Sequence, residues 1–196
     1  MNKIREERMK FIKQKRKGSG ATGYVCLFVI MLIMVILTMY MIQVAKLMTH
    51  QHHIDDSLTD SVLASLVADD TYYFETYEET GTPVIRLRST DNSFGVYMDC
   101  MTDAIADADN YYYNFGFDTF ICYEVEGSEV TVSTYSETSS VEQISYGQVG
   151  VVKTPTNEVV TKTSAYGKVR FDIANIIGDS YVTKTKDIYC TLEINE

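Results

Sequence analysis

The chain of 196 residues contains very little that would interrupt a long apolar helix near its N-terminus. Between Lys17 and Lys46 there is no Asp, Glu, Lys, Arg or His, and from Tyr24 to Thr80 there is neither glycine nor proline. Most residues from Tyr24 to Val44 are Leu, Ile, Met, Val or Phe. As a helix, these 21 positions would span roughly 30 Å, the thickness of the hydrocarbon core of a bilayer. The sequence therefore predicts one membrane span that begins at Tyr24 and ends at Val44.

A cleaved secretory signal is the alternative explanation for this segment. The apolar part of such a signal has about 7 to 15 residues and leads to a cleavage site made of small residues. The apolar run here is longer, and Val44-Ala45-Lys46 at its end is a poor cleavage site. We therefore expect a retained single-pass segment.

Charge is distributed unevenly on the two sides of the predicted span. The first twenty residues contain eight Lys or Arg and two Glu, whereas the rest of the chain contains nine Lys or Arg and 25 Asp or Glu. Basic residues beside a span remain in the cytoplasm. The sequence thus predicts a protein of the cell membrane with a cytoplasmic N-terminus and an extracytoplasmic domain after Lys46.

Motifs for cofactors and catalysis are missing as well. Gly18, Gly20 and Gly23 form a G-x-G-x-x-G pattern, but a basic run precedes it and an apolar run follows, so the strand that feeds a dinucleotide-binding loop is not predicted. There is no C-x-x-C pair and no G-x-S-x-G sequence. The basic N-terminus lacks the interleaved aromatic residues of a nucleic-acid-binding segment. We expect no enzyme activity, no catalytic residues, no cofactor, no small-molecule substrate and no nucleic-acid partner.

The three histidines form the one cluster that resembles a metal site. His50, His52 and His53 are followed by Asp55 and Asp56. On a helix the three imidazoles point in different directions, whereas a zinc site needs three or four converging ligands. We interpret the cluster as a polar collar just outside the bilayer and expect no metal there.

Two further groups of residues have a structural and a functional interpretation. Asp99, Asp103, Asp107 and Asp109 are spaced as the solvated face of a helix and not as the ligands of an EF-hand loop, so we expect no calcium site. The tyrosines at 72–73 and 111–113, with Phe115, fit a partly buried aromatic seam. They would also suit an adhesive patch or a contact between subunits, because tyrosine combines a large apolar area with a polar tip.

The four cysteines fall on both sides of the predicted membrane boundary. Cys26 lies in the first turn of the span, whereas Cys100, Cys122 and Cys190 follow it. Cys122 and Cys190 both alternate in phase with apolar residues of predicted strands. They are the pair to test for a disulfide, and two buried free thiols are the alternative.

An amphipathic helix is predicted to continue from the span. Leu47, Ile54, Leu58, Val62 and Leu66 recur at helical spacing, while Asp55, Asp56, Ser57, Thr59 and Asp60 occupy much of the other surface. We expect the helix to fray near residues 68–73, where Thr71, Tyr72 and Tyr73 favour extended backbone. The resulting organisation is a basic leader (1–18), a transmembrane segment (19–45), an extracytoplasmic helix (46–70) and an exported domain (71–196).

The exported domain is predicted to be α+β, with a small antiparallel sheet packed by the long helix and by one short helix. The short helix follows a capping turn at 91–93 and carries an apolar stripe from Phe94 to Ala108. Gly127-Ser128 predicts a hairpin between strands at 118–126 and 129–136. Further strands are expected at 84–88, 148–153, 158–163, 168–173 and 187–194, with a turn at 154–157 and a loop at 137–147.

This plan resembles the type IV pilin-like superfamily, and more narrowly the TadE/TadF-like pseudopilins of tight-adherence (Tad) pilus loci. The resemblance is carried by the basic run before Gly18, the small residues that lead into the span, the stretch Ile54-Asp55-Asp56-Ser57-Leu58-Thr59-Asp60-Ser61-Val62-Leu63-Ala64-Ser65, and the strands between Gly150 and Phe171. It covers most of the chain, and its motifs are mainly hydrophobic patterns.

The resemblance implies a structural role in a pilus or a related secretion apparatus. Prepilin peptidase would cut after Gly18 and leave Ser19 as the new N-terminus. In pilins the fifth residue after the cut is usually glutamate, whereas here it is Gly23, which favours a minor or membrane-retained subunit over a major pilin. The implied partners are the membrane, other pilin or pseudopilin subunits, the assembly platform and prepilin peptidase. The alternative is an unprocessed single-pass surface protein whose acidic exodomain binds a ligand or partner.

Overall fold

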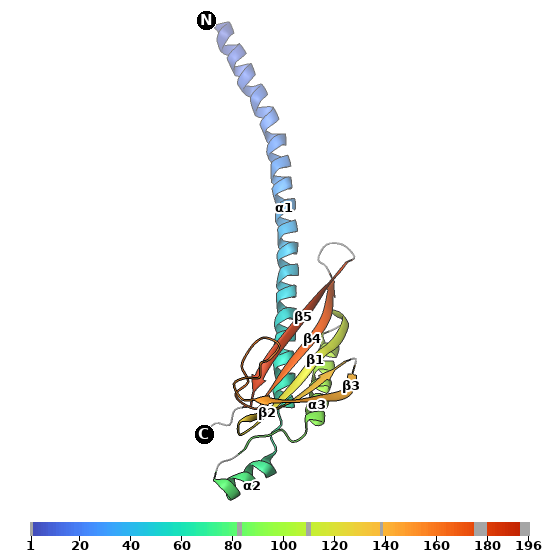
Figure 1. Cartoon of the computed structure of the whole chain (residues 1–196). Coiled ribbons are helices and arrows are strands. Elements are labelled where there is room, and N and C mark those ends of the chain that lie inside the picture. The colour runs from blue at the N-terminus through green and yellow to red at the C-terminus, as the bar shows by residue number, and fades with distance from the viewer. Residues whose placement is uncertain (1, 82–83, 109–110, 138, 175–179, 193–196) are drawn as a thin grey trace. The chain divides into compact units, whose positions relative to one another are not determined.

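The structure, a computed structural model, describes residues 2–81, 84–108, 111–137, 139–174 and 180–192, with side chains described from residue 20 onwards except at 139–141. Two compact units are present, Met1–Thr49 and His50–Glu196. Within the described residues the fold is α+β, as the sequence predicts, with three helices and one five-stranded sheet (Figure 1). The elements are α1 (Asn2–Ser65), α2 (Asp70–Thr80), α3 (Thr90–Asp107), β1 (Tyr112–Glu126), β2 (Glu129–Ser136), β3 (Ser139–Gln148), β4 (Ser164–Ala174) and β5 (Tyr181–Thr191).

The last four turns of α1 belong to the C-terminal unit and supply part of its core. Ile54, Leu58 and Val62 are completely or almost completely buried, and Leu66 just beyond the helix is buried too. Residues at steps of four lie on one face of a helix, so these side chains form a continuous apolar stripe. The predicted amphipathic continuation is confirmed for these positions, while Leu47 is only half-buried.

The sheet is antiparallel throughout, with the strand order β3-β2-β1-β4-β5. The predicted hairpin between β1 and β2 is confirmed, with Val125 opposite Val130 and Glu126 opposite Glu129. Gly127 in the turn has φ +62°, a conformation that glycine adopts without a steric penalty. The predicted strands at 168–173 and 187–194 correspond to the longer β4 and to β5, except that Leu192 follows the end of β5 and residues 193–194 lie outside the described residues.

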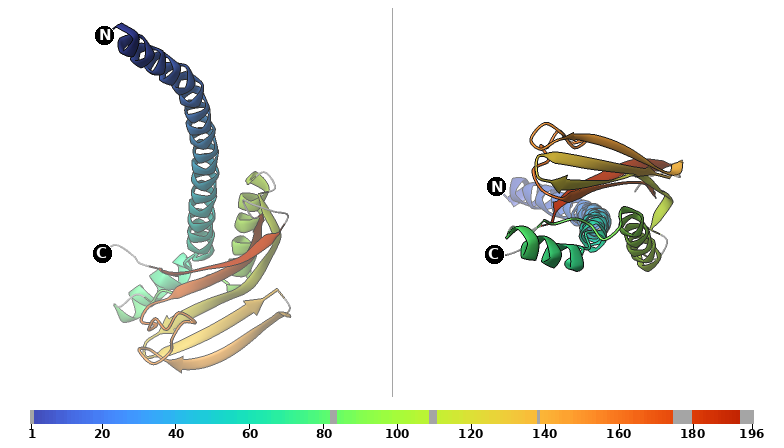
Figure 2. Two further views of the ribbon diagram at one scale, coloured as in Figure 1. Left: turned by 90° about the horizontal axis from the view of Figure 1, so that it is seen from above. Right: turned by 60° about the horizontal axis from the view of Figure 1, so that its bottom comes forward.

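Helices cover one face of this sheet, as the two views of Figure 2 show. Tyr97 of α3 stacks on Phe120 of β1 with ring centroids 4.6 Å apart, and both side chains are buried. Gly167 of β4 makes this packing possible, because a Cβ atom there would lie 2.6 Å from Val62 and 3.0 Å from the ring of Tyr97. Both helices can therefore approach the backbone of β4 closely.

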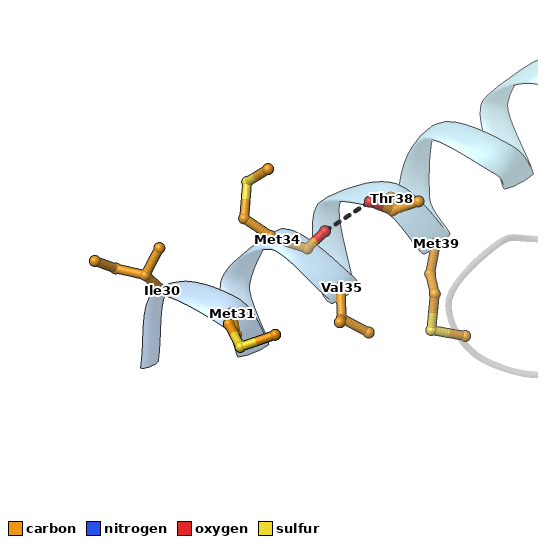
Figure 3. A pocket seen from close by; sticks show the side chains of 6 residues that line it. All are labelled: Ile30, Met31, Met34, Val35, Thr38 and Met39. Carbon is orange, nitrogen blue, oxygen red and sulfur yellow. Dashed lines mark hydrogen bonds between the residues drawn. The ribbon is translucent and has the colours of Figure 1, made fainter. Parts of the chain in front are cut away.

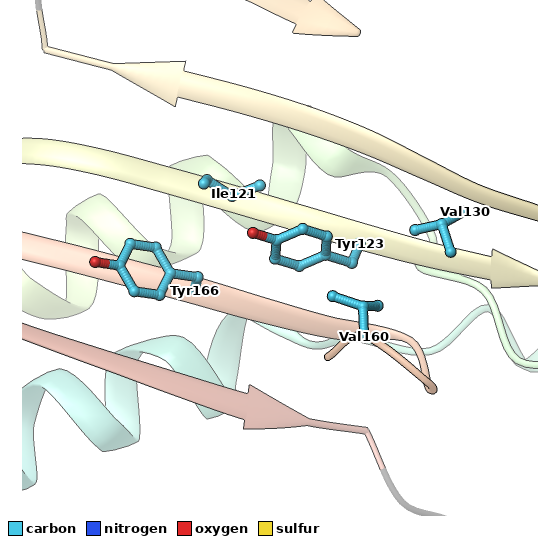
Figure 4. Close-up of a cluster of buried hydrophobic side chains, with 5 residues drawn as sticks. All are labelled: Ile121, Tyr123, Val130, Val160 and Tyr166. Atoms are coloured by element: carbon cyan, nitrogen blue, oxygen red, sulfur yellow. The ribbon is translucent and has the colours of Figure 1, made fainter. Parts of the chain in front are cut away.

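The opposite face of the sheet has a smaller core of its own (Figure 4). Ile121 and Tyr123 of β1, Val130 of β2 and Tyr166 of β4 form a buried cluster with Val160. Val160 comes from the segment 149–163, which covers this face. The predicted turn at 154–157 is present, since the Thr154 N–H donates to the carbonyl of Glu158 and the Asn157 N–H donates to that of Thr154.

The strands predicted on either side of that turn are not formed. Lys153 and Val159 make only an isolated bridge, and the Val160 N–H donates to the carbonyl of Val152 at 3.0 Å. Val149, Val152 and Val160 pack onto the sheet, whereas Val151 and Val159 are exposed, and the segment does not extend the sheet at an edge. Burial of Val160 explains why the apolar pattern suggested a strand.

Two expectations around α2 are wrong. Residues 70–73 are helical, because the carboxylate of Asp69 caps α2 by accepting the N–H of Tyr72 at 3.2 Å, which outweighs the preference of tyrosine for extended backbone. Residues 84–88 are not a strand of the sheet. They pair with residues 67–69 through the bridge between Ala68 and Leu87 and through the Arg88 N–H, which donates to the carbonyl of Val67.

The predicted loop at 137–147 is also wrong, because most of it forms the edge strand β3. Its pairing with β2 places Gly147 opposite Val130 and Ser145 opposite Val132. An edge strand needs only one hydrogen-bonded neighbour and can expose polar residues, so serine and glutamine are compatible with it. The short helix α3 is confirmed, with Ser89 as its N-cap, accepting the N–H of Asn92, and with Tyr97 and Met101 buried.

Candidate membrane segment and exposed surfaces

The apolar part of α1 is long enough to cross a membrane by length and composition. The helical segment Gly20–Ser65 contains an 18-residue window with a mean hydropathy of 2.9, none of which is buried within the chain. It includes every residue of the predicted span, and the large side chains from Tyr24 to Ile42 are about half or more exposed. An apolar surface of this extent is energetically unfavourable in water and favourable in hydrocarbon. The predicted span is thus matched by one suitable helix.

Two threonine hydroxyls of this segment bond to the backbone of the helix itself. Six side chains line a shallow groove on the helix surface, and only one of them, Thr38, carries a hydroxyl (Figure 3). That hydroxyl donates to the carbonyl of Met34 at 2.8 Å, and Thr49 donates to the carbonyl of Ala45 at 3.0 Å. Each is an i to i−4 bond of the kind that removes an unsatisfied donor from hydrocarbon. The groove is lined by Ile30, Met31, Met34, Val35, Thr38 and Met39.

The first histidine of the collar is held by the tyrosines that begin β1. The His50 imidazole stacks on the ring of Tyr111, with centroids 3.5 Å apart and planes within 7°. The edge of Tyr112 faces the same imidazole, and its hydroxyl donates to the His50 carbonyl. Burial raises the pKa of Tyr112 to about 12, so this hydroxyl stays protonated. These contacts lie within the C-terminal unit and attach its helical part to the start of the sheet.

The other members of the predicted collar do not converge. Asp55 forms an ion pair with Lys186 of β5, whose Nζ lies 2.8 Å from Oδ1. His52 is exposed, and Nδ1 of His53 is buried without a hydrogen-bond partner in the part of the chain that is described. Among the described residues no three His, Cys, Asp or Glu side chains come together as a metal site. Asp99, Asp103 and Asp107 lie on the exposed side of α3, and Asp109 lies outside the described residues.

The remaining aromatic residues are divided between core and surface. Tyr72 is half-buried, with the guanidinium of Arg86 3.6 Å from its ring centroid. Phe115 packs edge-on against Phe117, whereas Tyr113 is 41% exposed. The two groups do not form one seam, because the Tyr72 hydroxyl donates to Glu126 at the end of β1, whereas Tyr111, Tyr112 and Tyr113 lie at its start.

The disulfide between Cys122 and Cys190 is not formed, and both residues are free thiols. Cys122 of β1 pairs with Ala165 of β4, which pairs in turn with Cys190 of β5. The two cysteines are thus two strands apart, which separates their Cα atoms by about 10 Å. A disulfide needs Cα atoms closer than about 7 Å. Both thiols lie on the same face of the sheet, and sequence alternation predicts that shared face but not the strand between them.

We expect thiol chemistry to distinguish the cysteines of the folded protein. Burial raises the pKa of the Cys122 thiol strongly and that of the Cys190 thiol less, so little reactive thiolate is available at Cys122. With maleimide under native conditions, Cys122 should remain unlabelled until the protein unfolds, and Cys122→Ala should leave the native labelling unchanged. Mass spectrometry of unreduced, unfolded protein should find four reactive thiols. The loss of two thiols that a reductant restores would contradict the structure.

A polar contact between α3 and the sheet escaped prediction. The Thr90 hydroxyl donates to the carboxylate of Glu142 at 2.9 Å, and the Tyr135 hydroxyl donates to Asp91 at 3.0 Å. Hydrogen bonds from Ser133 and then Thr90 lower the pKa of Glu142. Glu142 falls in the segment that was expected to be a loop. Its contact with Thr90 could therefore not be predicted without recognising β3.

The predicted cleavage position lies within α1. Gly18 and Ser19 are helical, and their side chains are not described. Gly20 and Gly23 are also helical, so the glycine pattern does not form a phosphate-binding loop. Comparisons of the chain with protein-family models, curated proteins and solved structures gave no match.

Proposed function

We propose that this chain is a minor pilin or pseudopilin, a membrane-anchored structural subunit of a Tad or type IV-like pilus or of a related secretion apparatus. The observation that carries the proposal is that one helix has an exposed apolar part and a part that is buried in a folded domain. Its first part exposes apolar side chains, and its last four turns bury Ile54, Leu58 and Val62 against a sheet. A subunit built in this way can be held in a membrane by the first part while it displays a folded domain by the second.

The proposed arrangement places the basic N-terminus in the cytoplasm and the sheet domain outside. Eight Lys or Arg residues among the first twenty support this orientation. The proposed role is structural and non-catalytic, and the partners are other pilin or pseudopilin subunits, the assembly platform and prepilin peptidase. In such an assembly the groove from Ile30 to Met39 would lie against lipid chains or a neighbouring helix.

The N-terminus of the native protein tests the proposal. Processing by prepilin peptidase would remove Met1 to Gly18, so the mature chain should begin at Ser19 in cells that have the peptidase and at Met1 in cells that lack it. Gly18→Leu should block the cut, whereas Gly20→Leu, which changes a neighbouring glycine of the same helix, should not. Retention of residue 1 in all four samples, together with no co-purification with pilus components, would refute the proposal.

Gly23 supports a second candidate function. The family glutamate that pairs with a neighbouring subunit is missing at this position. An unprocessed single-pass protein whose exodomain binds a ligand or partner would have no need for that glutamate. An uncleaved chain that faces the exterior, and that stays in the membrane when the pilus machinery is deleted, would favour this alternative.

A further inference from the structure

One end of the sheet exposes aromatic side chains that its own packing does not require. Tyr112 pairs with Ile173 and Tyr181 pairs with Ala174, so the starts of β1 and β5 lie at the same end of the sheet as the end of β4. The rings of Tyr113 and Tyr181 meet edge to face, 5.0 Å between centroids. They are 41% and 55% exposed, respectively. We define the aromatic end by these described residues: Tyr111, Tyr112, Tyr113, Tyr181 and Val182.

The aromatic end is tied to the first residue of the C-terminal unit. His50 stacks on Tyr111 and accepts a hydrogen bond from Tyr112 through its carbonyl. The helix then runs away from this end, since Asp55 bonds Lys186 and Val62 lies over Gly167, progressively further along β4 and β5. Within this unit, the aromatic end is therefore next to the point where the apolar helix enters.

Chain length limits how far the aromatic end can lie from the span. His50 is six residues after Val44, the last residue of the apolar run. Six residues reach about 20 Å when fully extended and about 9 Å as a helix. The headgroup layer adds about 5 to 8 Å on each side of the hydrocarbon core. Whatever the arrangement of the two units, His50 and its tyrosine partners are held close to that layer.

Tyrosine is suited to this environment, because its ring is apolar and its hydroxyl can bond to headgroups or water. We propose that the aromatic end rests in the headgroup layer of the membrane that α1 crosses, with Tyr113 and Tyr181 inserted, so that the partner of this surface is a phospholipid bilayer. This inference rests on the membrane anchorage in the proposed function and is independent of pilus assembly.

Charges of both signs lie near this end, since Arg170 acts on Asp172 and Lys184 is on the neighbouring strand, and a zwitterionic lipid avoids a net contribution from either sign. Asp172 lies opposite Tyr113 in the sheet and accepts hydrogen bonds from Asn114 at 2.7 Å and Thr183 at 2.6 Å. These bonds, that of Asn114 first, lower the pKa of Asp172 and keep it negative at neutral pH. A negative carboxylate beside the inserted rings would be repelled by an anionic surface. Phosphatidylcholine is therefore the test lipid.

The chain has no tryptophan, so a single Tyr→Trp substitution creates a unique fluorescent probe. Tyr113→Trp and Tyr181→Trp report on the aromatic end. Tyr40→Trp reports on the span. Tyr146→Trp is the matched control, because Tyr146 is 79% exposed but lies toward the other end of the sheet, where it pairs with Thr131. Each full-length variant is reconstituted into phosphatidylcholine vesicles with or without lipid brominated near the headgroup end of the acyl chains.

We expect bromine to quench the probes at 113 and 181 by at least about twofold more than the probe at 146, because interfacial aromatic rings sit at this depth. Strong quenching at 40 with equal, weak quenching at 113, 181 and 146 would overturn the inference and leave the membrane anchor intact. An unquenched probe at 40 would overturn both, since no span would then be in the bilayer.

Discussion

Replacing Tyr97 with alanine is expected to destabilise the C-terminal unit by about 3 to 5 kcal/mol, the usual cost of truncating a fully buried aromatic side chain. Tyr97 has no exposed surface, stacks on Phe120 and meets Phe117 edge-on at 5.7 Å. Its ring also covers Gly167, so the truncation would leave a cavity between α3 and the middle of the sheet. Unfolding of the full chain in detergent, followed by circular dichroism in increasing denaturant, would measure the loss.

Tyr97→Phe is the matched control and should behave in the opposite way. The Tyr97 hydroxyl is buried and has no hydrogen-bond partner among the described residues. Burial without a partner also raises its pKa, because the charged form would be costly there. Removing an unsatisfied hydroxyl should be neutral or should stabilise the unit by about 1 kcal/mol. If Tyr97→Phe instead cost as much as Tyr97→Ala, the hydroxyl would have a partner and this part of the core would need revision.

The sequence predicts best those elements in which the local spacing of residue types directly reflects which side chains are buried or which turn is formed. Ile54, Leu58 and Val62 recur at helical spacing and become the buried stripe of α1. The hairpin at Gly127 is equally local, because the turn conformation depends on one residue and its neighbours. In both cases the residues that predict the element are also the residues that stabilise it.

The elements that sequence analysis missed depend on partners far away in the chain. β3 is polar and is a strand because β2 offers it an edge. The segment at 149–163 has a strand-like valine pattern, yet it forms no strand of the sheet, and Val160 packs into the cluster on the sheet face opposite the helices. The separation of Cys122 from Cys190 by a whole strand likewise follows from strand order, which alternation along each strand does not encode.

The candidate membrane segment and the exposed surfaces also differ in how far the sequence predicts them. Residues 24–44 could be recognised as a candidate membrane span from composition alone, because a bilayer selects for length and hydrophobicity and not for a particular packing arrangement. The histidine collar could be located but its contacts could not, since the stacking of His50 on Tyr111 joins residues 61 positions apart. The exposed pair of Tyr113 and Tyr181 depends on the pairing of three strands and was not expected.

Two aspartates in the middle of the span should abolish stable membrane insertion. Twelve of the 21 residues from Tyr24 to Val44 are Leu, Ile, Phe or Val. On an insertion scale each such residue contributes about −0.3 to −0.6 kcal/mol, or about −5 kcal/mol together. An aspartate at the centre costs about +2.5 to +3.5 kcal/mol. The double variant Ile33→Asp with Leu37→Asp would therefore cancel the whole favourable contribution.

The readout for this variant must separate membrane insertion from aggregation. Flotation of cell membranes through a density gradient after carbonate extraction does so, because aggregates sink and inserted protein floats. Ile33→Ala with Leu37→Ala changes the same two positions without adding charge and should float like the wild type, since alanine at these sites removes only about 1 kcal/mol. If the aspartate variant floats as well, the helix is not held by hydrocarbon, and the exposed apolar surface of α1 must be covered by protein instead.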